Sequence, residues 1–207
     1  MPVKIDALLA DLRNFRAETN ANRRMLPQIR DRVRESGVQR ILQPKSHGGA
    51  GGPLRDIVDS LTQIGAACGS SGWSIAQYVL HNYMVAQWPE DGRAEIWGKD
   101  PKALVAGILV PSMGRYEITD GGFSVTGRWS WVTGVDTCDW CMVTAYERDN
   151  VSHETHRHFM LRRDEVEIID TWHAIGLCGS GTNDVRLEKK FVPNHLSLTM
   201  EDLRGGE

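Results

Sequence analysis

The first hundred residues repeat their apolar positions at intervals of three and four, the period of a helix that buries one side. The spacing begins with the apolar residues Ile5, Leu8, Leu9, Leu12 and Phe15. Charged residues fill the positions between them, which predicts an amphipathic helix. Three further helices are expected, over about Asn22–Glu35, Pro53–Ala67 and Trp73–Gln87.

Local residue types set the expected ends of these helices. The second is rich in arginine and should stop at Ser36-Gly37, because glycine often ends a helix. Pro53 is expected in the first turn of the third helix, where its missing N–H costs nothing. The fourth helix is apolar on nearly all sides, so we expect it to be buried.

The pattern changes near Ala103. A continuous apolar run, Leu104 to Val110, is followed by alternating segments with turn signals at Thr119–Gly122, Glu147–Asn150 and Arg162–Asp164. This predicts an α+β chain, with a helical domain over residues 1–103 and a β-domain over 104–198. Thr199 has the character of an N-cap, so residues 199–207 should begin another helix.

Composition narrows the function classes. The chain has 207 residues, 41% of them hydrophobic, which is enough to bury a real core. A formal net charge of −3 argues against nucleic-acid and anionic-membrane partners. The apolar runs are too short to span a bilayer and the N-terminus lacks a signal-peptide core, so we expect a soluble, cytoplasmic protein. Its four cysteines are expected to be reduced thiols.

Two motifs suggest chemistry that their context does not support. The glycine-dense loop His47–Gly52 invites a phosphate-loop interpretation, but no Gly-Lys-Ser/Thr follows it and no apolar strand precedes it. We expect a flexible or substrate-side loop. The pair Cys138-x2-Cys141 nearly has zinc-finger spacing to His153, His156 and His158. Strand-like alternation places the two cysteines on opposite faces, so no metal site is predicted.

The segment Gly127–Gly134 has the residues needed to hold a planar ring system. Trp131 can stack on the rings, Thr133 and nearby backbone N–H groups can bond their polar edge, and Gly134 lets the chain turn closely. A flavin has both a flat ring face for stacking and a polar edge for hydrogen bonds. Taken alone, the same residues are also compatible with a strand that carries two core tryptophans and ends at a turn.

A resemblance favours the first interpretation. Trp131-Val132-Thr133-Gly134 resembles the Trp-Ile-Thr/Ser-Asn/Gly element of the acyl-CoA dehydrogenase superfamily, which lies along the flavin ring. Further motifs, in order from about residue 20 to 200, resemble the 4-hydroxyphenylacetate 3-hydroxylase-like aromatic monooxygenases of that fold: Gly69-Ser70-Ser71-Gly72-Trp73, Glu95-Ile96-Trp97-Gly98-Lys99-Asp100-Pro101, Gly121-Gly122-Phe123-Ser124-Val125-Thr126-Gly127-Arg128-Trp129, Asp170-Thr171-Trp172 and Gly176-Leu177-Cys178-Gly179-Ser180-Gly181-Thr182.

The resemblance implies a fold, an activity and partners. The fold would be an N-terminal helical domain and a barrel-like middle β-domain, with the C-terminal four-helix bundle of the family, which carries most of its tetramer contacts, absent. The activity would be that of the oxygenase component of a two-component monooxygenase. It would use reduced FMN or FAD, supplied by a separate NAD(P)H:flavin reductase, and O2 to hydroxylate an aromatic small molecule.

The resemblance also implies roles for particular residues. Trp131, Val132, Thr133 and Gly134 would bind the flavin. His81 lies sixteen residues before Trp97, where the family has a catalytic histidine that polarises a phenolic hydroxyl. Without the resemblance, a histidine on an apolar helix is more simply a core residue. The remaining family positions are expected to line the substrate, and they are Trp73, Ser112 and Trp172.

The chain departs from the family at several points, and two rival functions stay open. Gly107-Ile108 stands where many members carry a serine, and Cys178 stands in place of a common arginine. A second catalytic histidine belongs to the bundle. The first rival is an acyl-CoA dehydrogenase with bound FAD, although Val110-Pro111-Ser112 replaces its expected Glu-Pro-Gly segment. The second rival is a non-catalytic half-protein that pairs with a partner chain.

Overall fold

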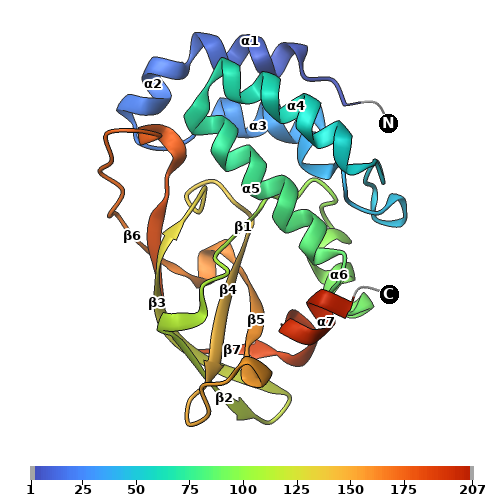
Figure 1. Ribbon diagram of the computed structural model, residues 1–207, viewed down its shortest axis with the longest axis vertical. Coiled ribbons are helices and arrows are strands. Elements are labelled where there is room, and N and C mark those ends of the chain that lie inside the picture. The colour runs from blue at the N-terminus through green and yellow to red at the C-terminus, as the bar shows by residue number, and fades with distance from the viewer. Residues whose placement is uncertain (1–2, 206–207) are drawn as a thin grey trace.

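The computed structural model describes residues 3–205, which form helices followed by a sheet (Figure 1). The helices are α1 Asp6–Asn14, α2 Arg16–Ala21, α3 Pro27–Ser36, α4 Leu54–Ala67, α5 Gly69–Val85, α6 Glu90–Trp97 and α7 Met200–Gly205. The strands are β1 Val105–Gly107, β2 Gly114–Thr119, β3 Gly122–Val132, β4 Trp140–Glu147, β5 Arg157–Arg162, β6 Glu167–Ile169, β7 Asn183–Pro193 and β8 Ser197–Thr199.

The helix expected over Asn22–Glu35 is wrong in its first half. The chain instead forms α2, which ends at Ala21, and resumes as α3 only at Pro27. Arg23 between them has a left-handed φ of 56°, which breaks the helical path, and Pro27 starts the new helix without needing its N–H. The expected end is confirmed, because Gly37 adopts φ 75° directly after Ser36.

Two other helix expectations need smaller corrections. Pro53 precedes α4 with an extended backbone instead of lying inside its first turn. The helix α5 is not buried all round: Trp73, Leu80 and Tyr83 expose between 43% and 50% of their surfaces. Its buried side carries several polar residues among the apolar ones, including Ser74, His81 and Asn82. Hydropathy alone therefore overestimated how completely α5 is buried.

The strands form one eight-stranded sheet in the order β6-β7-β3-β2-β4-β5-β8, with β1 paired to β4. The pairings are antiparallel except where β1 and β2 meet β4. The described end strands β6 and β8 are not paired with each other, so the sheet is open and the expected barrel is not confirmed. The mixed helix-and-sheet architecture is the α+β fold that the sequence predicts.

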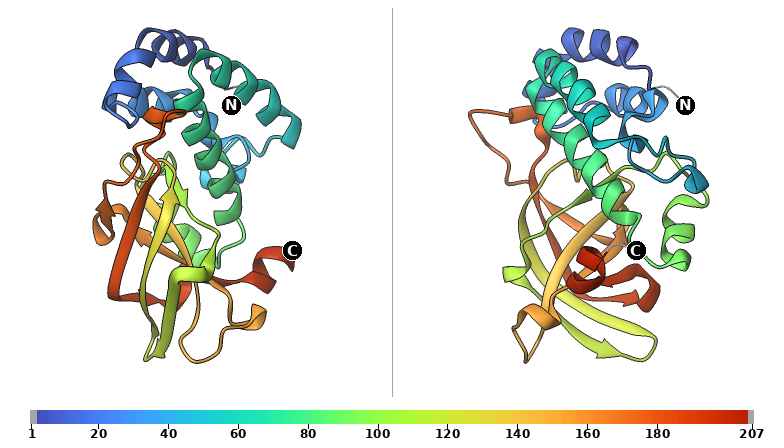
Figure 2. Two further views of the ribbon diagram at one scale, coloured as in Figure 1. Left: turned by 60° about the vertical axis from the view of Figure 1, so that its left-hand side comes forward. Right: turned by 45° about the vertical axis from the view of Figure 1, so that its right-hand side comes forward.

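The helical part and the sheet share one hydrophobic core. The helix α5 runs diagonally from the other helices along the strands and contacts β1 (Figures 1 and 2). On the other side, the long connection between β6 and β7 rises to α2. The strand end that follows Trp131 therefore lies where α5 and this connection meet the sheet. No described helix is long and apolar enough to cross a membrane.

Candidate functional site

The end of β3 turns one tryptophan outward while its neighbours stay buried. Trp129 and Val132 are 1% and 0% exposed, whereas Trp131 is 68% exposed. The register between β3 and β7 shifts across these residues, and Trp131 has a left-handed φ of 69°. A bulky side chain rarely adopts this conformation, and such strain persists where surrounding structure enforces it, often at functional sites. The result is an indole face open to a ligand.

The turn after this tryptophan is held closely by its neighbours. Gly134 has φ 75°, and a Cβ placed there would lie 2.5 Å from the hydroxyl oxygen of Tyr78. Only glycine permits that approach. Its N–H is shared between the carbonyls of Ser180 and Gly181, at 3.1 and 3.2 Å. Its carbonyl accepts a 2.7 Å hydrogen bond from Tyr78, and burial raises the pKa of this phenol so that it stays a donor.

A row of hydroxyl groups lies behind the exposed indole. The Thr133 hydroxyl accepts a 3.1 Å hydrogen bond from Nε1 of Trp73 and lies 3.1 Å from the Thr182 hydroxyl. The Thr182 hydroxyl is 2.7 Å from that of Ser180. A hydroxyl can make three hydrogen bonds, so Thr133 keeps capacity for a ligand edge. Trp73, which is expected to contact substrate, joins α5 to this row through its indole N–H.

A pocket of about 240 Å³ lies beside the exposed indole, lined by Ile108, Val110, Met113, Trp129, Ser130 and Trp131. Its wall is mostly apolar, and Val110 and Met113 are more than half exposed. Aromatic and aliphatic lining with a few polar groups at one edge is typical of small-molecule sites. Within the segment Ile108–Met113, the sequence predicted this role only for Ser112.

His81 lies deeper, on the side of α5 that faces β1. It is 2% exposed, and its Nδ1 is 3.2 Å from the backbone carbonyl of Val105. A carbonyl can only accept, so Nδ1 carries the proton and Nε2 is the basic nitrogen. Burial lowers the pKa of His81 to about 4, so the ring is neutral near pH 7. This geometry fits both a core histidine and a hydrogen-bond acceptor.

The other two residues expected to contact substrate are Trp172 and Ser112. Trp172 is on the connection between β6 and β7, where its Nε1 donates to the carbonyl of Leu177 and its backbone N–H donates to Asn183. No described hydrogen bond joins it to His81 or Trp131. Ser112 lies on a short 3-10 helix, Pro111–Met113, at the rim of the pocket. Its side chain is outside the described part of the chain.

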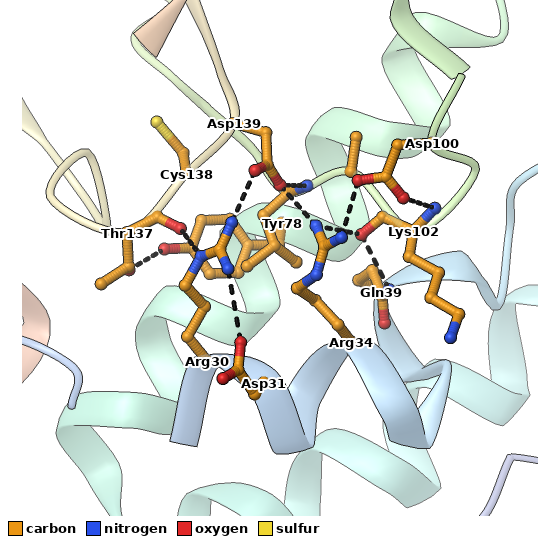
Figure 3. Close-up of polar contacts among 12 residues, drawn as sticks. Arg30, Asp31, Arg34, Gln39, Tyr78, Asp100, Lys102, Thr137, Cys138 and Asp139 are labelled. Atoms are coloured by element: carbon orange, nitrogen blue, oxygen red, sulfur yellow. Dashed lines mark hydrogen bonds and ion pairs between the residues drawn. The ribbon is translucent and has the colours of Figure 1, made fainter. Parts of the chain in front are cut away.

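Sequence reasoning missed the residues that hold the turn in place (Figure 3). From α3, Arg30 donates to the carbonyl of Thr137 and pairs with Asp139 at 2.6 Å. Arg34, one turn further, pairs with the same carboxylate at 2.8 Å. Asp139 also accepts the N–H of Leu104. The four-residue spacing of the two arginines was the available signal, because such residues share a helix face.

The glycine-dense loop is not shaped to cradle a phosphate. The backbone N–H groups of residues 48–52 donate to carbonyls of the preceding segment, residues 40–45. A phosphate loop needs such groups free and pointing at the ligand. The loop instead closes one side of a separate cavity of about 500 Å³, which Lys4 and Arg40 also line.

The chain is similar in sequence to known flavin enzymes. No known family profile matches it. It is 31% identical, over 96% of its length and 52% of the relative, to the flavin-dependent monooxygenase oxygenase subunit HsaA of Rhodococcus jostii. It is 30% identical, over 96% of its length and 49% of the relative, to the oxygenase component of an FADH(2)-dependent resorcinol hydroxylase of a Rhizobium species. It thus spans about half the length of each relative.

The fold comparison agrees with the sequence comparison. The crystal structure of 3-HSA hydroxylase from Rhodococcus sp. RHA1 matches with a TM-score of 0.88 and 32% identity, over 94% of this chain and 51% of that one. The resemblance to oxygenase components of two-component flavin monooxygenases is therefore confirmed. The chain is a homologue of about half of such a protein.

Proposed function

We propose that this chain is part of the oxygenase component of a flavin monooxygenase that hydroxylates an aromatic small molecule with reduced flavin and O2. The observation that carries the proposal is the exposed, strained Trp131 with the Thr133 hydroxyl row behind it. The related oxygenases, which are similar over nearly the whole length of this chain, are named as flavin-dependent or FADH(2)-dependent.

The residues at the end of β3 fit a flavin. Trp131 offers an indole face for the ring system, and the Thr133 hydroxyl retains hydrogen-bonding capacity for its polar edge. Gly134 permits the close approach of Tyr78 that holds the turn after Thr133. We assign reduced FMN or FAD to this place, where the backbone of Val132 would lie beside the flavin. When bound, the reduced flavin supplies the reaction with oxygen.

The protein positions the substrate and excludes water from the pocket. The apolar residues Ile108, Val110 and Met113 border the pocket next to Trp131, and an apolar border excludes water from the reacting groups. His81 is the group assigned to the substrate: its neutral ring keeps a basic Nε2 that can accept the proton of a phenolic hydroxyl. Trp73, Ser112 and Trp172 are proposed to complete the substrate surroundings.

The proposal extends to the organisation of the whole protein. Residues 1–103 and 104–198 would act as the helical and barrel-like domains of the acyl-CoA dehydrogenase fold, and a C-terminal four-helix bundle would complete the site. A separate NAD(P)H:flavin reductase would provide the reduced flavin, and the full-length form would be a cytoplasmic tetramer. The fold match supports the fold assignment, and the name oxygenase component in a relative supports the separate reductase.

The test is turnover of a simple phenol. The protein is mixed anaerobically with reduced FMN or FAD and the phenol, and oxygen is then admitted. His81→Asn should lower the rate of hydroxylated product by about 10²–10⁴-fold, the usual range for a positioned acid–base group. The oxygen consumed should then appear as hydrogen peroxide. His153→Asn, which changes an exposed histidine, is the matched control.

Two results would contradict the proposal. Product formation by His81→Asn at the wild-type rate, with no extra hydrogen peroxide, would return His81 to a core role. Anaerobic bleaching of bound FAD by an acyl-CoA would instead indicate the dehydrogenase alternative.

A further inference from the structure

A second cavity lies in the helical part of the chain and shares no lining residue with the pocket beside Trp131. Its volume is about 500 Å³, and it is lined by residues 3–4, by residues 35–37 with Arg40, and by residues 48–50 of the glycine-dense loop. The N-terminal segment and the loop lie on the same side of the helices (Figures 1 and 2). The cavity is therefore built from segments that are separate in the sequence.

Backbone hydrogen bonds hold the walls of this cavity. The N–H of Lys4 donates to the carbonyl of Ser36 at 3.4 Å, which joins the N-terminal segment to the end of α3. The N–H groups of residues 48–52 donate to carbonyls of residues 40–45. A ligand in the cavity cannot use these loop N–H groups, so side chains must recognise it.

Arg40 brings to the cavity a positive charge that has no counterion. Its Nη1 donates to the carbonyl of Gly48 at 2.6 Å, which fixes one end of the guanidinium. Its Nε is buried without a hydrogen-bond partner, and no described carboxylate lies within ion-pair distance of the group. Burial lowers the pKa of Arg40, and the charge of Asp100 offsets this effect only in part. A partly buried charge without a counterion is costly, so a bound anion would stabilise it.

The other end of the guanidinium is available to a ligand. Nη2 of Arg40 has no described hydrogen-bond partner and is open to solvent. It lies 3.3 Å from the point where a Cβ on Gly37 would be, so a side chain at that position would crowd it. One guanidinium nitrogen is thus held by the loop while another can donate to a bound molecule.

Two acidic groups near this cavity have arginine partners of their own. Asp100 pairs with Arg34 at 2.6 Å. Glu35, which lines the cavity, pairs with Arg32 at 2.8 Å. Lys4, the second cation in the lining, is exposed and pairs with no described carboxylate. The cavity wall therefore carries an excess of positive charge, although the whole chain has a formal net charge of −3.

We propose that this cavity binds a small oxyanion of the phosphate class, held by Arg40 and Lys4. Two cations match the two negative charges of a phosphate better than the single charge of a carboxylate. The fixed guanidinium donates a charge-assisted hydrogen bond to a phosphate oxygen, and the lysine ammonium adds a second charge on a flexible stem. The bound anion would tie the N-terminal segment to the glycine-dense loop. This site is separate from the proposed flavin site and does not depend on it.

Titration of the whole chain with inorganic phosphate tests the site without flavin or substrate. Calorimetry gives the dissociation constant, with the ionic strength held constant by sodium chloride. Arg40→Gln should weaken phosphate binding by roughly tenfold or more, because a charge-assisted donor is lost. Lys4→Gln removes an exposed charge and should weaken it by about two- to fivefold. Lys45→Gln, which changes an exposed lysine outside the cavity lining, is the matched control and should bind like the wild type.

Amide chemical shifts measured by nuclear magnetic resonance during the same titration locate the anion. Phosphate should move the amide signals of residues 36–37 and 48–50, which line the cavity. This measurement decides the question even if Arg40→Gln does not fold, because it needs only the wild type and Lys4→Gln.

Three results would overturn the proposal. The first is no saturable binding of phosphate by the wild type, or shifts confined to residues outside the cavity lining. The second is the same dissociation constant for the wild type as for Arg40→Gln or Lys4→Gln. The third is tighter binding of benzoate than of phosphate at the same ionic strength, which would contradict the assignment of a doubly charged ligand.

Discussion

Two polar regions of this protein, one partly buried and one fully buried, differ in whether their polar atoms have hydrogen-bond partners. Around the turn after β3, the side chains of Arg30, Arg34, Tyr78 and Asp139 all have hydrogen-bond partners. Beneath the end of α5, His158 and its neighbours His156 and Trp88 have buried nitrogens without described partners. The first region fixes a backbone conformation, and the second leaves buried nitrogens without described partners, which lowers stability.

The two regions therefore affect the stability of the protein in opposite directions. A fully bonded network is rigid, and here it holds Trp131 in a conformation that the residue would otherwise avoid. An unbonded cluster costs stability, because its buried polar atoms have given up their hydrogen bonds to water without gaining others. Each prediction below changes one region and leaves the other intact.

The largest expected effect is acid destabilisation through the unbonded region. The folded protein holds the pKa of His81 at about 4 and that of His158 at about 3, against 6.5 in an unfolded chain. Below about pH 6.5 the unfolded state binds these protons and the folded state does not. The free energy of unfolding should therefore fall as pH drops, by about 3 kcal/mol for each histidine near pH 4.

Urea unfolding at a series of pH values measures this loss. His158→Leu should remove its share of the decline and His153→Gln should not. A stability curve that is flat between pH 7 and 4, or the same slope in His158→Leu, would contradict the buried neutral state assigned to these rings.

The next effect is expected in the bonded region. Asp139→Ala leaves Arg30 and Arg34 without their shared carboxylate and the N–H of Leu104 without an acceptor. We expect a loss of about 3 kcal/mol in the free energy of unfolding. Asp31→Ala removes a carboxylate that is mostly exposed, and it should cost less than about 0.5 kcal/mol in the same assay. Equal effects of the two changes would show that the network does not hold the turn.

A smaller effect is expected from the phenol that holds Gly134. Tyr78→Phe removes a hydroxyl that donates to Gly134 and contacts Thr137, at 2.7 Å each. The expected cost is about 1–2 kcal/mol in thermal or urea unfolding, because the Gly134 carbonyl would lose a buried donor. Tyr83→Phe on the exposed side of α5 provides the control. If Tyr78→Phe leaves the free energy of unfolding unchanged, the turn at Gly134 does not depend on the Tyr78 hydroxyl.

The smallest effect should have the opposite sign. Trp131→Gly relieves a left-handed backbone that Trp131→Ala retains, so the glycine variant should be more stable than the alanine variant by about 1 kcal/mol. Urea unfolding of the pair measures the difference. If alanine is the more stable, the conformation at this position is not strained.

Much of the fold and part of the site could be predicted from the sequence. The three- and four-residue apolar steps located α1 and α4, and Gly37 ended α3 as expected. The Trp131–Gly134 segment was found because an aromatic, a hydroxyl and a glycine in sequence are a local signal. Local signals suffice where the neighbours along the chain determine the conformation.

The rest depends on contacts between distant segments. The break at Arg23 coincides with its ion pair to Asp170, 147 positions away, which no helical pattern predicts. The orientation of α5 is set by which face meets the sheet, and its buried serines and histidine mislead a hydropathy argument. Asp139 and Trp73 gained their places through partners on other elements.

The central claim is that the end of β3 binds a reduced flavin, and one measurement tests it most directly. Anaerobic titration with reduced FMN or FAD, followed by tryptophan fluorescence and calorimetry, gives the dissociation constant of the wild type and of Trp131→Ala. Loss of a stacking surface worth about 1 kcal/mol should weaken binding several-fold, and Trp88→Phe, a change outside the pocket beside Trp131, should not. Equal dissociation constants for wild type and Trp131→Ala, or no binding by the wild type, would contradict the account.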